Sequence, residues 1–177
     1  NPYSYASNTS RVLDPSATYV ANYAPFNIFN ELNNNYIDLN TLDARFQLEF
    51  KYKPIKGLEL SLLGAFKYMA STQEHFVKDN SNQALAYRAM ANGIIRDANK
   101  YLYKDPNNPY VLPMTVLPYG GLYHKGDNRM SDYDIRATAN YSHTFAEKHI
   151  MNLFGGMELK SIERQRNVFE GAGLRYD

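Results

Sequence analysis

Apolar and polar side chains alternate along four stretches of the chain. Between positions 42 and 52 every even residue is apolar and every odd residue is polar or charged, so a strand here has one apolar and one polar face. A helix would mix the two sets around its circumference, and the period of two predicts a β-strand. A similar but less regular pattern predicts strands over about 58–69, 133–145 and 149–159.

The connections between these strands are alternately short and long. Residues directly opposite each other in an antiparallel pair point to the same side of the sheet. The apolar positions are even-numbered in both strands of the first hairpin and odd-numbered in both strands of the second. Each turn is therefore predicted to contain an odd number of residues, barring a bulge. Pro54-Ile55-Lys56 followed by a left-handed Gly57 suits the first turn, and Ala146-Glu147-Lys148 the second. The link from about Val77 to Arg129 is roughly 50 residues long, which compact soluble domains seldom contain.

Strand length favours a membrane barrel over a soluble sheet, although alternation alone fits a soluble sheet with one face on a core. Predicted strands of about 11 residues exceed the usual 5–6 and match the 9–11 tilted residues that cross a bilayer. Short turns on one side and long loops on the other are typical of outer-membrane barrels. The fold class that we predict is therefore all-β: an antiparallel transmembrane β-barrel segment of about four long strands in two hairpins, with a long, partly helical extracellular loop.

The barrel interpretation assigns a position to each polar and aromatic row. Polar residues opposite the apolar rows are predicted to face an aqueous lumen: Arg45, Glu49, Lys51 and Arg136. Aromatic residues near both ends of the apolar rows match the girdles of such barrels: Tyr52 and Phe145 by the turns, and Phe66, Tyr68 and Tyr133 by the long loop. Four strands cannot close a barrel, so the chain is predicted to be part of a larger one.

This interpretation divides the chain into five segments. An extracellular loop over 1–41 precedes the first hairpin over 42–76, the long extracellular loop covers 77–129, the second hairpin covers 130–167, and 168–177 starts the next loop. Within the long loop, apolar residues at helical spacing predict a helix near 82–98, with Ser81 as its N-cap. Five loop tyrosines offer flat apolar area and a hydroxyl, and they are our predicted contacts for a ligand or a covering protein: Tyr101, Tyr103, Tyr110, Tyr119 and Tyr123.

Composition excludes several other classes of function. The 19 basic and 18 acidic residues are scattered, which gives no electrostatic reason to expect nucleic acid. Cysteine is absent, and no run of about 18 apolar residues predicts a transmembrane helix. No phosphate-binding loop or nucleophile elbow occurs, and we expect no catalytic residue, cofactor or metal. Glu74, His75, His124 and Asp127 could meet at the base of the long loop, but their spacing does not demand a metal ion.

The two hairpins resemble those of SusC/RagA-type TonB-dependent transporters. The first likeness is Phe46-Gln47-Leu48-Glu49-Phe50 running into Ile55-Lys56-Gly57-Leu58. The second is the run Ile135–Ser142 followed by Lys148-His149, and by Asn152, Gly156 and Glu158 at the spacing H-x-x-N-x-x-x-G-x-E. The likeness covers about 39–69 and 132–163, and the loop over 79–123 looks like one found in part of the family.

The resemblance implies a bacterial outer-membrane protein that imports glycans or oligopeptides without making or breaking a bond. It implies a 22-stranded barrel, a SusD-like surface lipoprotein as a covering partner, and energy from TonB through a plug outside this stretch. An alternative is a soluble carbohydrate-binding β-sandwich, which would fold without detergent. A second alternative, an outer-membrane enzyme, would need a base beside Ser61, Ser142 or Thr144, and no histidine shares their polar faces.

Overall fold

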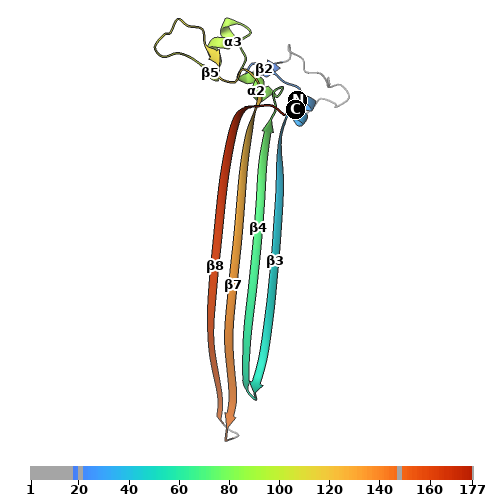
Figure 1. The fold of residues 1–177 in the computed structure, drawn as a ribbon, viewed down its shortest axis with the longest axis vertical. Helices are drawn as coiled ribbons and strands as arrows, with labels where there is room; N and C mark the ends of the chain where they lie inside the picture. The colour runs from blue at the N-terminus through green and yellow to red at the C-terminus, as the bar shows by residue number, and fades with distance from the viewer. Residues whose placement is uncertain (1–17, 20–21, 147–148, 177) are drawn as a thin grey trace. The chain divides into compact units, whose positions relative to one another are not determined.

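Four long antiparallel strands dominate the computed structural model, which describes residues 18–19, 22–146 and 149–176. They form one sheet in the order β3-β4-β7-β8, so the two hairpins are joined by the pairing of β4 with β7 (Figure 1). The protein is therefore all-β in class, as predicted. The strand bounds are β3 Asn35–Ile55, β4 Leu58–Val77, β7 Gly121–Phe145 and β8 His149–Leu174.

Each predicted strand is present, and each is longer than the alternation suggested. The strands contain 21, 20, 25 and 26 residues. The added residues lie mainly on the side of the long loop, where polar side chains occur on both faces and the period of two is lost. Backbone pairing needs no such period, because the ladder of hydrogen bonds joins main-chain groups. Thus 35–41, 121–129 and 168–174, which we expected to be loop, continue the strands.

The pairing of β3 with β4 keeps the predicted parity. The strand bounds leave only Lys56 and Gly57 between them, yet the cross-strand contacts Lys53–Glu59 and Thr41–Ser71 join residues of like parity. The parity along the strands is thus as predicted, but the turn is not: Pro54 and Ile55 belong to β3, and two residues remain between the strands instead of an odd number. Gly57 has the predicted left-handed backbone, with φ 86°. Between β7 and β8 the gap is the predicted three residues, and Ala146 is left-handed there at φ 48°.

The predicted single helix near 82–98 is wrong, because this region forms two shorter helices. α2 spans Asn82–Ala86 and α3 spans Gly93–Ala98. Ser81 caps α2 as predicted, with its hydroxyl accepting from the Ala84 amide at 3.1 Å. Asn92 caps α3 in the same way, because its side chain accepts from the Ile95 amide. This hydrogen bond starts a new helix at Gly93 in place of one continuous helix over 82–98. The expected apolar stripe is broken as well, since Ile94 is 79% exposed.

The remaining described elements are short. α1 begins at Ile28 and is capped by Asn27, whose side chain accepts from the amides of Phe29 and Asn30. The bounds are β1 Thr18–Tyr19, paired with β2 Ala24–Pro25; α1 Ile28–Asn34; and β5 Leu102–Tyr103, paired with β6 Met114–Thr115. Among the described residues, no helix has the length and apolar content that a membrane crossing requires.

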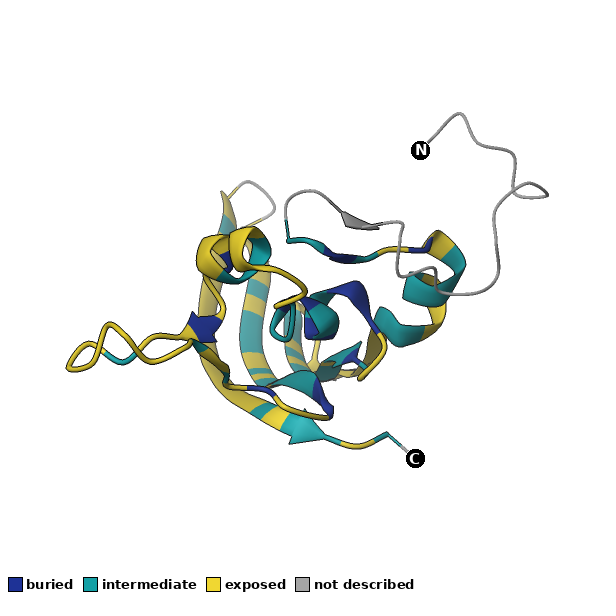
Figure 2. Ribbon diagram, turned by 90° about the horizontal axis from the view of Figure 1, so that it is seen from above, coloured by how far each residue is buried: buried dark blue, intermediate teal, exposed yellow. Residues whose placement is uncertain are grey.

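The chain divides into two compact units. We name them the loop-end unit, over 1–39, 73–126 and 168–177, and the sheet unit, over 40–72 and 127–167. The loop-end unit contains a small core of Val77, Ala84 and Leu117, with Tyr87 and Leu122 packed against it. Figure 2 shows the dark blue of buried residues on α2 and on the short strands β2 and β5, whereas α1 and α3 contain no buried residue.

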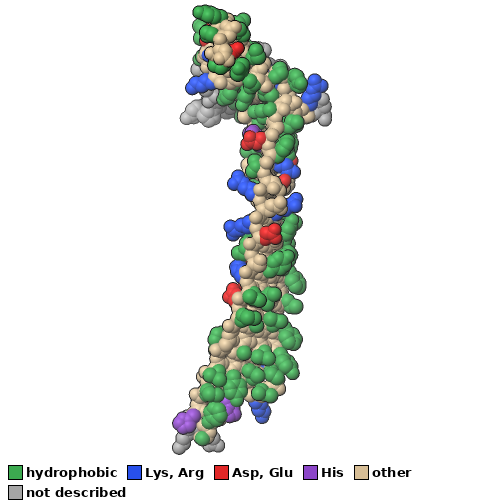
Figure 3. Space-filling model, turned by 60° about the vertical axis from the view of Figure 1, so that its left-hand side comes forward, with side chains coloured by type: hydrophobic (Ala, Val, Ile, Leu, Met, Phe, Trp, Pro, Cys, Tyr) green, Lys and Arg blue, Asp and Glu red, His purple; other side chains and the backbone are tan. Residues whose placement is uncertain are grey.

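The sheet unit has no buried residue among those described. Its apolar row remains open on every strand, with Leu48 63%, Leu62 49% and Met157 61% exposed. In Figure 3 the hydrophobic side chains run along one side of the strands, and the charged side chains lie along the other. A single layer of sheet therefore presents two faces of opposite character, and nothing in the described chain covers the apolar one.

Candidate functional site

The polar face of the sheet unit carries the residues predicted to line a lumen. Arg45 and Arg136 line one shallow recess of about 260 Å³, together with Lys67, Lys160 and the carboxylates of Asp132 and Asp134. Glu49 and Lys51, which lie on this face of the same strand, form an ion pair at 3.2 Å. The structure thus places all four predicted residues on one face; that the face borders a lumen stays a prediction.

Ion pairs between neighbouring strands place opposite charges side by side on this polar face. Lys67 pairs with Asp43 at 3.2 Å between β4 and β3. On the other hairpin Arg136 pairs with Glu158 at 3.3 Å. Because these side chains are partly exposed, each pair is worth only about 0–1 kcal/mol, and the face carries charges of both signs. The Ser61 hydroxyl donates to the Glu49 carboxylate at 3.3 Å.

The five predicted tyrosines do not form one cluster. Tyr101 packs against Tyr87 with ring centroids 4.7 Å apart, and Tyr110 is 95% exposed. Tyr123 lies within β7, donates its hydroxyl to Glu74, and contacts the rings of Phe76 and Phe169. Tyr123 thus has a structural environment, while Tyr103 is half exposed on β5.

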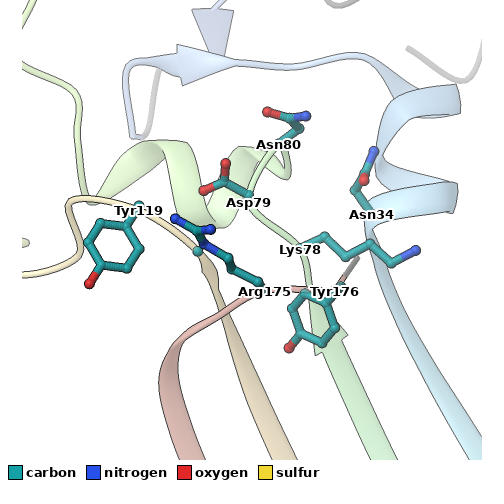
Figure 4. Close-up of a pocket in the computed structure, with 8 residues that line it drawn as sticks. Asn34, Lys78, Asp79, Asn80, Tyr119, Arg175 and Tyr176 are labelled. Carbon is teal, nitrogen blue, oxygen red and sulfur yellow. The ribbon is translucent and has the colours of Figure 1, made fainter.

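Tyr119 is the predicted tyrosine that lines a pocket. This pocket has a volume of about 400 Å³ and lies within the loop-end unit (Figure 4). Its lining residues come from the end of α1, the segment after β4, the segment before β7 and the segment after β8. They are Asn34, Lys78, Asp79, Asn80, Tyr119, Gly120, Arg175 and Tyr176. Residues far apart in sequence meet here because the strands that precede or follow them are neighbours in one sheet.

Arg88 fixes the wall of this pocket. Its guanidinium donates to the carbonyls of Leu117, at 2.7 Å, and Gly120, at 2.5 Å. It also forms an ion pair with Asp79 at 2.8 Å, and its side chain is only 19% exposed. One arginine therefore ties the segment after β4 to the segment before β7, which are the two segments that supply Asp79 and Tyr119.

Tyr176 closes another side of the pocket. Its hydroxyl donates to the Leu122 carbonyl at 2.5 Å, and its ring meets Phe76 edge-on at 5.9 Å. Burial raises the pKa of this phenol above its usual value. The hydroxyl thus acts as a hydrogen-bond donor to the backbone.

The structure brings together only part of the histidine and carboxylate group that the sequence singled out. The rings of His75 and His124 stack with centroids 5.9 Å apart. Glu74 instead accepts from Tyr123, and Asp127 accepts from Thr72 at 2.8 Å. Among the described residues no group of three or more ligands is arranged to hold a metal ion.

Sequence reasoning missed the cationic residues of the pocket. Lys78, Arg88 and Arg175 are isolated in sequence, and no spacing rule connects them. Only the turn-rich stretch around Tyr119 carried a signal, through its Pro and Gly residues.

Comparisons with known proteins do not place the chain in a family. No protein-family model matches it, and no curated protein sequence matches it.

Proposed function

We propose that the sheet unit is part of the wall of a membrane-spanning β-barrel, with its apolar row against lipid and its polar face toward water. The observation that carries this proposal is the uncovered apolar face. A soluble sheet of this size would bury that face under a second layer, because each large side chain left in water forgoes about 1.5–3 kcal/mol. Lipid supplies the missing layer without a further domain.

The position at which the apolar row ends on each successive strand indicates that the strands are tilted. Backbone hydrogen bonds set the register at two seams: the Lys78 amide donates to the Asn34 carbonyl between β3 and β4, and the Ser142 amide to the Gly57 carbonyl between β4 and β7. The Arg136–Glu158 pair aligns β7 with β8. In this register Leu42 faces Ala70, but the last large residue of the β4 row is Tyr68. Tyr68 faces Ser131, and the β7 row ends at Tyr133. The end of the row thus moves about two residues toward the turns at each strand.

The other border of the row moves in the same direction. Tyr52 faces Leu60, whereas the β4 row continues two residues further to Leu58. Leu58 faces Tyr141, and the β7 row continues four residues further to Phe145. The β8 row ends at Met151, opposite His143, so this border moves toward the turns from β3 to β7 but not from β7 to β8. A shift of two residues, about 6.8 Å, over a strand spacing of about 4.8 Å corresponds to a tilt of roughly 55°, which is above the 35–45° of known membrane barrels but in the same sense along the sheet.

The height of the band also fits a bilayer. The proposed spanning segments are 42–52, 58–68, 133–145 and 151–159. Eleven residues at about 3.4 Å each, tilted by about 45°, rise roughly 26 Å, which matches the apolar band of about 25 Å in such barrels. Beyond the row the same face turns polar on each strand, at Asn40, Thr72, Ser131 and Glu163.

Closure of the barrel requires more strands than these four. β3 and β8 are the outer strands of the sheet, and unpaired backbone groups in lipid cost several kcal/mol each. We therefore propose that both strands pair with further strands of a larger barrel.

At a finer level, we propose a SusC/RagA-type transporter in the bacterial outer membrane. The hairpin motifs support this assignment. The barrel would import glycans or oligopeptides, with a SusD-like lipoprotein over its outer end and TonB acting through a plug. The protein would act by binding and passage alone, with Arg45, Glu49, Lys51 and Arg136 lining a hydrated lumen.

Spin labels can test the membrane placement directly. The chain contains no cysteine, so single cysteines can be introduced without a background. We choose adjacent residues on opposite faces, Gln47→Cys and Leu48→Cys, with Asn40→Cys beyond the apolar row. With the full-length protein in phospholipid vesicles, we expect the label at 48 to collide mainly with oxygen dissolved in lipid. The labels at 47 and 40 should collide mainly with a water-soluble nickel complex.

A soluble β-sandwich predicts a different result. The chain would then fold cooperatively in buffer without vesicles, and a label at 48 would be shielded from both reagents. Equal access of the nickel complex to 47 and 48 in vesicles would also contradict the membrane proposal. For the transporter assignment, the expected result is copurification of the full-length protein with a SusD-like lipoprotein, and loss of cargo uptake without TonB.

A further inference from the structure

The pocket lined by Tyr119 contains two cationic side chains, Lys78 and Arg175, that are not ion-paired with a described carboxylate. The Lys78 ammonium lies 5.3 Å from the ring centroid of Tyr36, and the Arg175 guanidinium carbon lies 5.6 Å from that of Tyr119. Within the described part of the chain, neither cation forms an ion pair within 4.0 Å. An aromatic face orients a cation without neutralising its charge, so both remain available to an anion.

Asp79 is the one acidic side chain that lines the pocket, and its charge is already balanced. Arg88 pairs with it at 2.8 Å from outside the lining. In Figure 4 the Asp79 carboxylate and the Arg175 guanidinium lie on the same side of the pocket, next to Tyr119. The lining as a whole therefore carries a net positive charge.

Two left-handed glycines fix the wall that bears Arg175 and Tyr119. Gly120 has φ 73° and Gly173 has φ 76°. A Cβ on Gly120 would lie 2.5 Å from the carbonyl carbon of Gly173, so only glycine permits this approach of two backbones. Because the backbones meet here, Tyr119 and Arg175 project side by side, and the pair is held before any ligand arrives.

We propose that this pocket binds a ligand carrying a carboxylate next to a ring or peptide unit. Arg175 would receive the carboxylate through its paired donors, Lys78 would add a second positive charge, and the Tyr119 ring would pack against the adjoining unit. The volume of about 400 Å³ is within the 300–1,000 Å³ usual for small-ligand sites. Two sources share this chemistry: a uronic-acid oligosaccharide and the carboxyl end of a short peptide.

This inference rests on the proposed function in one respect: it takes the bound ligand to be the molecule that the barrel imports. Binding can be measured whether or not the sheet unit enters a membrane. A chain that inserts but fails to bind overturns the inference alone, whereas a chain that binds but does not insert overturns the proposed function alone.

The experiment compares acidic with matched neutral probes by titration calorimetry. The probes are trigalacturonic acid against galactotriose, and trialanine against trialanine amide. They are added to the full-length protein in vesicles, or to the chain in buffer, as the labelling result directs. At low salt we expect one acidic probe to bind at least tenfold more tightly than its neutral partner. Whichever acidic probe binds identifies the source of the carboxylate. The difference should shrink at high salt.

Variants separate the site from general charge. Arg175→Gln should weaken binding of the acidic probe at least tenfold, and Arg175→Lys should weaken it less. Arg166→Gln, an equal change of charge at an exposed β8 residue of the sheet unit, should leave it unchanged. Should Arg175→Gln alter the fold, Lys78→Gln provides the second test. Equal binding of acidic and neutral probes, or equal effects of R175Q and R166Q, would overturn the inference.

Discussion

The loop-end unit and the sheet unit are stabilised in different ways. The loop-end unit encloses a small apolar core, and buried polar side chains such as Asn82 and Asn99 bond to backbone carbonyls within it. The sheet unit buries no described side chain and relies on its backbone ladder and exposed ion pairs. The first unit therefore covers apolar side chains with its own residues, whereas the second leaves its apolar face uncovered by the described chain.

The largest effect is expected from a charge on the apolar face. Leu48→Arg places a cation near the middle of the β3 row, where it should cost about 2–4 kcal/mol of folding free energy in a bilayer. Gln47→Arg, one residue away on the polar face, should change it by less than about 1 kcal/mol. Unfolding titrations of the full-length protein in phospholipid vesicles measure both. A similar cost for the two variants would remove the distinction between the faces.

The next largest loss of folding free energy is expected from a substitution of the turn glycine Gly57. Gly57→Ala should cost about 2 kcal/mol, because alanine strains a left-handed backbone and its Cβ would meet the Ser142 carbonyl oxygen at 2.1 Å. Gly64→Ala is the matched control, since nothing lies within 4 Å of its added Cβ. The same vesicle titrations should show no loss for G64A, and a loss as large as that of G57A would refute the turn geometry.

The loop-end unit should respond to the loss of a buried amide. Asn82 is 8% exposed and donates to the carbonyls of Ala24, at 3.0 Å, and Pro25, at 2.9 Å. Asn82→Ala leaves these acceptors without their donor, at an expected cost of about 1–2 kcal/mol. Asn107→Ala, at an exposed loop position, should be neutral. Hydrogen exchange of the amides in α1 and α2 reports the change, and equal protection in both variants would contradict it.

The smallest effect concerns the titration of His75, which lies outside the proposed spanning segments. Burial, and then the neighbouring His124, lowers the pKa of His75 below 6.5. The unfolded chain therefore takes up this proton first as pH falls, so the stabilisation present above pH 6.5 is lost as pH drops through the folded pKa.

Proton NMR of the imidazoles measures this shift. His124→Ala should move the pKa of His75 part of the way back, because burial remains the larger cause. An unshifted pKa in the parent chain would exclude burial of this ring.

Much of the sheet followed from local pattern. The rows around Leu48 and Tyr141 predicted strands, and Gly57 predicted a left-handed backbone in the first turn, although the predicted length of that turn was wrong. These features are local, because side chains of a strand alternate and only glycine adopts a left-handed turn without strain. The extensions of β7 and β8 were missed because their side chains do not alternate, while main-chain hydrogen bonds continue regardless of side-chain type.

By itself, the sequence determined that four strands with one apolar and one polar face must form, since that follows from the order of side chains along an extended backbone. Only the tertiary structure decided that β4 pairs with β7, and thus that the apolar rows of both hairpins join on one face. It also decided that Lys78, Tyr119 and Arg175 line one pocket. The physical reason is that strand pairing decides which distant segments meet. Pairing is made by main-chain groups that are the same in every residue, so the local sequence does not specify which strand is the partner.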